Sequence, residues 1–243
     1  MKAKMMQSLL IARNLSKKFG GLIAVKNVSV EVGKGEFIAI IGPNGAGKTT
    51  LLNLISGFLK PDQGKVFLKG RDITNLSPNQ RAVLGIGRTF QIPQPFRNLT
   101  VLENCIAAAF FGGKIKDNES AITYALDILK LVGLYDKKDE LAGKLEVVDA
   151  KKLELARCLS QRSELLLLDE SGAGLSSFEI DELVGILERI SKEGVTIIMV
   201  EHIMSLIEKV AQRVLCMVNG EIISEGSLQK VLNDEKVIRS YLG

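Results

Sequence analysis

The sequence predicts an α/β fold that combines a mostly parallel sheet, an antiparallel β subdomain and an inserted helical lobe. Apolar runs of strand length alternate with helical segments toward both ends of the chain, which favours a parallel sheet with right-handed crossovers. A glycine-rich turn, GPNGAGKTT at 42–50, separates one such run from a helical segment. Between about 92 and 158 the pattern is that of helices joined by loops.

The N-terminal part is expected to form short strands over residues 8–41. VKNVSVEV (25–32) alternates apolar and polar residues, which is typical of a strand with one buried face. EFIAIIG (36–42) is continuously apolar, which indicates a strand buried on both faces. GKVFLKGRDI (64–73) is predicted to form another pair of strands.

The middle of the chain contains three predicted helices, TVLENCIAAAF, ESAITYALDILKLVGL and AKKLELARCLSQ, and Thr100 with Glu103 forms the pattern of a capping box. From Glu164 the alternation returns with the strand ELLLLDE, the helix SSFEIDELVGILERISKEG and the strand VTIIMVEH. A length of 243 residues suits one domain. We expect a single domain over 1–243, with its core in 1–91 and 159–243 and its helical lobe at about 92–158.

The composition disfavours several classes of protein. Lys plus Arg exceed Asp plus Glu by only 32 − 28 = 4, and Trp is absent, so nucleic-acid binding is not expected. The three cysteines are far apart, which favours a reducing compartment, and with one histidine and no cluster of ligands a metal site built from these residues is not expected. No apolar run approaches the roughly 20 residues that span a bilayer, and the N-terminus lacks the apolar region of a signal peptide. We therefore expect a cytoplasmic chain whose membrane role, if any, runs through another subunit.

The turn GPNGAGKTT matches the pattern GxxxxGK[ST] between a strand and a helix, which predicts a P-loop NTPase core. Gly45 and Gly47 allow backbone N–H groups to turn inward around phosphates, and the following helix adds its positive end. Lys48 supplies a charge for the β- and γ-phosphates, and Thr49 a hydroxyl for Mg²⁺. The predicted cofactors are therefore ATP and Mg²⁺, and the predicted cradle consists of Gly42, Pro43, Asn44, Gly45, Ala46, Gly47, Lys48, Thr49 and Thr50.

Three polar residues end buried strands of the same predicted sheet. Asp169 and Glu170 follow four leucines, and His202 follows TIIMVE, so all three are expected at the edge where open α/β sheets bind ligands. Asp169 is predicted to hold Mg²⁺ through water, and Glu170 to orient or deprotonate the attacking water. His202 is predicted to hydrogen-bond the γ-phosphate. Two acids at a strand end or a lone histidine also occur without function, but the nearby cradle favours a functional interpretation.

GPNGAGKTT, GRTFQ, LELARCL, LLLLDE and His202, in this order, resemble the ATP-binding subunit of an ABC transporter over nearly the whole chain. LSKKFGGLIAV, GRTFQIPQPFRNLTVLEN and VIRSYLG are most similar to the branch that imports branched-chain amino acids, amides and urea. The resemblance implies that Phe19 stacks on adenine, and that Gln91 touches Mg²⁺ and links the core to the lobe. It also places the docking of the membrane subunit at IPQPFRNLTVLEN, where Phe96 and Leu99 are either apolar anchors or part of the lobe core.

The implied function is an ATPase subunit at the cytoplasmic face of the membrane, with Glu170, His202 and Lys48 as catalytic residues and Thr49, Gln91 and Asp169 as metal-binding residues. The implied partners are membrane permease subunits and a second ATP-binding subunit, in a homodimer or heterodimer. A solute-binding protein would be linked only indirectly. An ABC ATPase without a transport role and a regulatory pseudo-ATPase remain the alternatives.

One loop departs from the family pattern. Where the family has LSGGQ, which contacts the ATP of the partner subunit, this chain has Leu145, Glu146, Val147, Val148 and Asp149. The valines disfavour positive φ and close backbone approach, Glu146 brings a carboxylate toward a polyanion, and Asp149 is placed to cap the following helix.

Two further departures follow the predicted catalytic glutamate. Ser171 replaces the usual proline, and Ser176 replaces the Asp or Asn of the dimer-contact loop, although Ser176 and Glu179 still form a capping-box pattern. One interpretation is an asymmetric heterodimer in which another subunit supplies an intact signature. The other is that backbone N–H groups and the helix dipole suffice at a loosened signature.

Overall fold

The computed structural model describes residues 8–112, 115 and 117–242. Its larger sheet has the order β10-β9-β3-β8-β7-β6, in which all neighbours are parallel except β10 and β9. The strands are β3 (Phe37–Ile41), β6 (Ile86–Arg88), β7 (Leu165–Asp169), β8 (Thr196–Val200), β9 (Arg213–Val218) and β10 (Glu221–Gly226). The predicted mostly parallel sheet is therefore confirmed.

The smaller sheet is antiparallel and has the order β2-β1-β4-β5. Its strands are β1 (Ser8–Phe19), β2 (Leu22–Gly33), β4 (Gln63–Leu68) and β5 (Arg71–Asp72). The expectation of short strands is wrong for β1 and β2, which have 12 residues each. Asn14 and Asn27 have φ near 50° and share a side-chain hydrogen bond of 2.9 Å, and the pairing register shifts around them. Asn14 and Asn27 therefore do not end a strand. They mark an irregularity in the pairing, and both strands continue beyond it.

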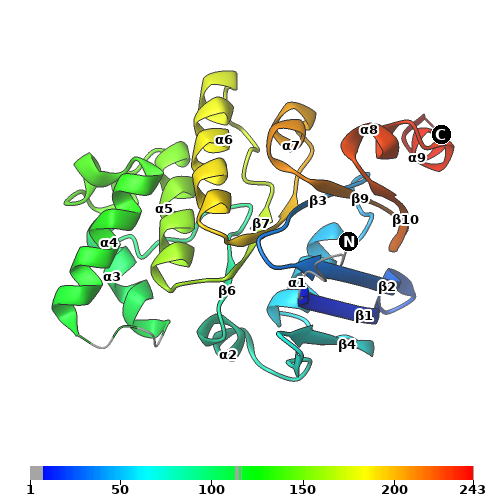
Figure 1. The fold of residues 1–243 in the computed structure, drawn as a ribbon, viewed down its shortest axis with the longest axis horizontal. Helices are drawn as coiled ribbons and strands as arrows, with labels where there is room; N and C mark the ends of the chain where they lie inside the picture. Colours follow the sequence, from blue (N-terminus) through cyan, green and yellow to red (C-terminus); the bar gives the residue numbers. More distant parts are fainter. Residues whose placement is uncertain (1–7, 113–114, 116, 243) are drawn as a thin grey trace, which may run out of the picture.

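The helices lie on both sides of the larger sheet and at one end of it (Figure 1). Those of the core are α1 (Lys48–Ser56), α2 (Pro78–Val83), α6 (Ser177–Lys192), α7 (Met204–Val210), α8 (Leu228–Leu232) and α9 (Glu235–Leu242). The group at the end of the sheet comprises α3 (Val101–Phe111), α4 (Asn118–Val132) and α5 (Val147–Ser160), with 3₁₀ turns at Tyr135–Lys137 and Ala142–Lys144. The expected lobe limits at about 92 and 158 stay a prediction.

The position of β3 between two cores explains why its sequence is continuously apolar. Phe37, Ala39 and Ile41 face a core shared with α5, α6 and α7, whereas Ile38 and Ile40 face a second core shared with α1 and the smaller sheet. Because successive side chains point to opposite faces of a sheet, a strand between two cores needs an apolar residue at every position.

Arg81 is an unusual member of the second core, because its side chain is 1% exposed and carries a charge. Its guanidinium donates to the carbonyls of Leu54 and Ile55, both at 2.7 Å, and to those of Thr74 and Leu76. A cation at this end of α1 complements the negative pole of the helix whose other end is the cradle.

Three negative findings concern the residues that the structure describes. Cys105, Cys158 and Cys216 are buried and free, with no disulfide among them. No helix in this part of the chain is long and apolar enough to cross a membrane. Nor do the described His, Cys, Asp and Glu residues gather in groups of three or more that could hold a metal ion by themselves.

Candidate nucleotide site

The turn between β3 and α1 is a cradle that only glycine permits at two positions. Gly42 and Gly47 have φ of 145° and 98°, and a Cβ on either would lie 2.0 Å from a backbone oxygen, of Met217 or Ala24. Gly47 also precedes α1 without a side-chain cap, so the first N–H groups of α1 stay available. The turn borders a cavity of about 300 Å³, lined by Phe19, Leu22, Ala24, residues 44–50 and Glu170.

Lys48 is folded back onto the cradle. Its Nζ donates to the carbonyls of Gly42 and Pro43, at 2.8 and 2.9 Å. Burial lowers the pKa of Lys48, although Glu170 and Asp169 oppose this. An ammonium group held among backbone dipoles in this position can exchange these carbonyls for phosphate oxygens.

Asp169 ends β7 and has a separate partner for each oxygen. Thr49 Oγ1 lies 3.2 Å from Oδ1, and Arg88 Nη2 donates to Oδ2 at 3.0 Å. Burial raises the pKa of Asp169, and the charge of Arg88 opposes this. A carboxylate, a hydroxyl and the nearby amide of Gln91 provide the oxygen ligands that Mg²⁺ prefers, with waters and phosphates completing its shell. The donor set therefore fits Mg²⁺.

The carboxylate of Glu170, directly after β7, is contacted by Gln91, which follows β6, and by His202, which follows β8. Gln91 Nε2 donates to Oε2 at 2.7 Å, and His202 Nε2 lies 3.3 Å from Oε1. Glu170 has φ of 50°, a conformation that costs free energy in a residue with a side chain and that collects at functional sites. Its N–H donates to Val200 O at 2.9 Å, which fixes the turn against β8.

Phe19 lines the same cavity and is 45% exposed, so its ring is open to a ligand. The structure thus brings together all the predicted residues of the cradle, the two acids, Gln91, His202 and Phe19. The roles assigned to them remain predictions, because the geometry shows proximity and contacts.

The sequence patterns did not reveal three further residues of the site. Glu201 is 1% exposed and accepts from the N–H groups of Gly172 and His202, both at 2.9 Å. Lys151, on α5, donates to the carbonyl of Ser171 at 3.0 Å and also to that of Ala173. Arg88 holds Asp169, as described above. The only available signals were the position of Glu201 beside His202 and that of Arg88 inside GRTFQ.

The loop at 145–149, which departs from the family pattern, differs from its expected structure in two ways. Helix α5 begins at Val147, three residues before the predicted start, and Glu146 precedes it with φ of −66°. The region has no positive φ, so the expected conflict between valine and positive φ does not arise. The prediction that Asp149 caps the helix is wrong, since Asp149 lies inside the first turn and its carboxylate binds the ammonium groups of Lys137 and Lys152.

As a result, the first turn of α5 has no side-chain cap, and its N–H groups point outward without a partner in the helix. Val147 is 62% exposed beside it. On the neighbouring element, Ser176 and Glu179 form the predicted capping box at the start of α6, and Phe178 is 80% exposed.

A groove of about 600 Å³ lies between the core and the α3–α5 group, and its lining includes Phe58, Val83, Arg88, Phe90, Phe96, Phe111, Glu154 and Arg157. Phe96 is 48% exposed beneath the guanidinium of Arg157, 4.7 Å from the ring centre, so it is not part of a core. Buried Asn104 fixes the backbone of this segment through bonds to both the N–H and the carbonyl of Phe96.

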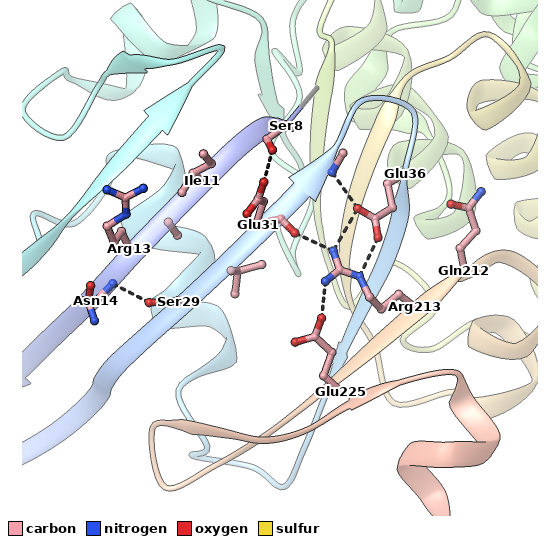
Figure 2. Close-up of a pocket in the computed structure, with 13 residues that line it drawn as sticks. Ser8, Ile11, Arg13, Asn14, Ser29, Glu31, Glu36, Gln212, Arg213 and Glu225 are labelled. Carbon is pink, nitrogen blue, oxygen red and sulfur yellow. Dashed lines mark hydrogen bonds and ion pairs between the residues drawn. The ribbon is translucent and has the colours of Figure 1, made fainter. Parts of the chain in front are cut away.

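Another polar cavity, of about 830 Å³, is lined by residues of β1 and β2 together with Glu36, Arg213 and Glu225 (Figure 2). Three of its charged groups, Arg213, Glu36 and Glu225, form ion pairs with one another. Arg213 binds Glu36, Glu225 and the carbonyl of Glu31. We therefore place the candidate site at the cradle.

A glycine-rich turn between β3 and α1, with an acidic pair at the end of β7, which is separated from β3 by β8 in the same parallel sheet, defines a P-loop nucleotide-binding protein. The model of the ABC transporter family matches residues 25–173, and the chain therefore belongs to the ABC transporter family. The chain is 37% identical over 255 residues to a protein of Salmonella typhimurium, covering 98% of this chain and 99% of the relative. That relative is named "High-affinity branched-chain amino acid transport ATP-binding protein LivG".

Solved structures agree with this assignment. An ATP-binding cassette of an ABC transporter in its ADP conformation is 34% identical, with a TM-score of 0.88 over 97% of this chain and 99% of that one. A dimeric cassette in a post-hydrolysis state, bound to ADP and Pi, is 26% identical, with a TM-score of 0.81 over 90% of this chain and 98% of that one. The predicted fold class and the family resemblance are confirmed.

Proposed function

We propose that the chain is the ATP-hydrolysing subunit of an importer for branched-chain amino acids or related amides, working at the cytoplasmic face of the membrane. The observation that carries this proposal is that Lys48, Thr49 and Glu170 line one cavity at the cradle, with the carboxylate of Asp169 3.2 Å from the hydroxyl of Thr49. The name of the Salmonella relative supports the solute class.

The residues divide the work as follows. Lys48 and the N–H groups of 44–50 bind the phosphates, while the exposed ring of Phe19 stacks on the base. Thr49, Asp169 and Gln91 would hold Mg²⁺, which would supply positive charge against the phosphates. Glu170 orients the attacking water and accepts its proton, and His202, 3.3 Å from Glu170, binds the γ-phosphate.

The partners follow from two exposed surfaces. We assign the apolar groove around Phe58, Phe96 and Phe111 to a permease subunit, because large apolar groups are exposed there at the junction of core and lobe. We assign the face with Val147 and Phe178 to a second ATP-binding subunit, consistent with the dimeric cassette described above. The solute-binding protein is reached only through the permease.

The structure favours a loop at 145–149 that can still bind the partner's phosphate, although more weakly, over a loop that no longer can. The uncapped N–H groups of α5 can still bind a phosphate, and Asp149 is neutralised by two lysines. Glu146 remains as an exposed carboxylate next to this helix end, so we expect its charge to weaken the partner's ATP site.

The deciding experiment measures the ATPase rate of the purified chain across a concentration series, with Glu170→Gln as the blank. A rate per molecule that rises with concentration and disappears in Glu170→Gln supports a homodimeric ATPase. ATP binding with a rate no higher than the blank would contradict self-sufficiency and indicate a heterodimer with another subunit's signature. Absence of ATP binding would overturn the proposed function.

A further inference from the structure

Arg88, the last residue of β6, contacts two parts of the molecule that have so far been described separately. Its Nη2 donates to Asp169 Oδ2 at 3.0 Å, and its Nη1 donates to Ser56 Oγ at 2.8 Å. The same guanidinium lies 5.4 Å from the ring centre of Phe90 and 5.8 Å from that of Phe58. The side chains of Arg88 and Asp169 are each only 5% exposed.

The two rings belong to the groove between core and lobe. Phe58 and Phe90 pack edge to face, with centres 5.4 Å apart, and both line the groove together with Arg88. Phe58 is 52% exposed, so it is open to an occupant of the groove. One planar cation is therefore both part of the groove wall and the counter-charge of the aspartate.

The contacts on Asp169 are divided in a way that suits metal binding. Arg88 occupies Oδ2, which leaves Oδ1 directed toward Thr49 and the cradle. A buried carboxylate has little water to hold it, so its orientation depends on such fixed donors. A guanidinium is rigid and planar, and it can stack on aromatic rings while it hydrogen-bonds an acid, which a lysine cannot do equally well.

Arg88 Nε is buried and has no hydrogen-bond partner. Since buried donors are normally paired, the position of the guanidinium is set by the rings, by Asp169 and by Ser56 rather than by satisfying every donor. A displacement of the rings would therefore move the group that holds Oδ2.

We propose that Arg88 is a positioning residue that sets the Mg²⁺-binding orientation of Asp169 and passes changes at the Phe58–Phe90 wall of the groove to that carboxylate. This inference rests on the proposed Mg²⁺-ATP site. It adds to the link through Gln91 a second connection, which starts from the groove wall and ends on the aspartate instead of on Glu170.

The test is equilibrium binding of a fluorescent ATP analogue to the full chain, without Mg²⁺ and over a Mg²⁺ titration. For Arg88→Met we expect Mg²⁺-free binding within about twofold of the wild type, and a Mg²⁺ concentration for half-maximal enhancement that is at least fivefold higher. Arg88→Lys keeps the charge but not the planar fork, so we expect a smaller increase. Should Arg88→Met fail to fold, as judged by circular dichroism, Arg88→Lys decides the question.

Phe58→Ala tests the connection to the groove. We expect a twofold to threefold increase in the Mg²⁺ requirement, and no further increase when Phe58→Ala is added to Arg88→Met, because both changes act through one guanidinium. Val83→Ala is the matched control, since Val83 is also exposed and lines the groove but places no ring against Arg88.

Specific outcomes would overturn the proposal. A normal Mg²⁺ requirement in Arg88→Met, with only a lower melting temperature, would leave Arg88 a purely structural role. An unchanged requirement in Phe58→Ala, or one equal to that of Val83→Ala, would remove the connection to the groove. A wild-type chain that binds the analogue without any effect of Mg²⁺ would instead overturn the proposed metal site, and this inference with it.

Discussion

The cradle and the start of α5 are both helix starts without a side-chain cap, but they are built differently. In the cradle the backbone passes so close to Met217 and Ala24 that Gly42 and Gly47 admit no side chain. At α5 the backbone has ordinary helical geometry, and Val147 is accepted without strain. Sequence change is therefore limited by sterics at the cradle and mainly by charge at α5.

This difference separates two kinds of departure from a family pattern. A substitution in the cradle would alter the path of the backbone, and the site with it. The substitutions at 146–149 leave the helix start in place and alter the field around it, because Glu146 is exposed and Asp149 is paired. Four substitutions test this comparison.

Lys48→Met should have the largest effect. It removes a charged donor from the cradle, and we expect ATP affinity to fall about tenfold to a hundredfold and hydrolysis by about a hundredfold or more. Nucleotide binding and phosphate release measure the two losses. Lys209→Met, which removes an exposed lysine outside the cavity lining, should leave both near wild type. Equal losses in the two variants would show that net charge, not the cradle, matters.

Glu146→Ser should increase the ATPase rate of the chain alone. Removing one carboxylate near a bound polyanion at a partly exposed site is worth about 1 kcal/mol, or roughly a fivefold increase in rate. Glu188→Ser, an exposed change on α6, is the matched control. If Glu146→Ser leaves the rate unchanged at all protein concentrations, the charge at this helix end does not limit catalysis.

Asp149→Ala should lower stability more than it lowers nucleotide binding. Asp149 is only 9% exposed, and its removal takes away one of the two carboxylate partners of Lys152, which keeps Glu182. It also takes away the carboxylate that pairs with Lys137. We expect a decrease of about 2–4 °C in the melting temperature, measured by calorimetry. Nucleotide affinity should stay within twofold, since Asp149 does not line the cavity. A large loss of affinity would contradict the separation of the two regions.

Ser176→Ala should have the smallest effect on the isolated chain. It removes the cap of α6, which is worth about 1 kcal/mol of unfolding free energy. Thr100→Ala removes the equivalent capping box of α3 and should cost a similar amount in chemical denaturation. If only Ser176→Ala also lowers the ATPase rate at a fixed concentration, the loop before α6 contributes to subunit contact.

Motifs with a fixed backbone geometry were predictable from the sequence. GPNGAGKTT and LLLLDE lie where their strand and helix contexts indicated, because glycine spacing and continuous apolar runs each permit few structures. The three capping boxes at Ser77, Thr100 and Ser176 also form, although only the last two were recognised in advance.

Contacts between distant segments were not predictable. Arg88 and Asp169 are 81 residues apart in the sequence. Lys151, on α5, binds the carbonyl of Ser171, which follows β7. No local sequence pattern could have predicted either contact. The error at Asp149 has a similar cause. An aspartate before a helical run favours a cap, but here lysines from two elements compete for its carboxylate, and the helix begins earlier.

The burial of the three cysteines has a practical consequence for studying the proposed dimer of ATP-binding subunits. Burial raises the pKa of the Cys105 and Cys158 thiols to about 12 and that of Cys216 to about 11, so all three are protonated at neutral pH and shielded from alkylating reagents. A single cysteine introduced at the exposed Phe178 would then be the only thiol to take up a spin label or a dye. The native chain thus already provides a background-free scaffold for measuring distances between two copies as nucleotide is added.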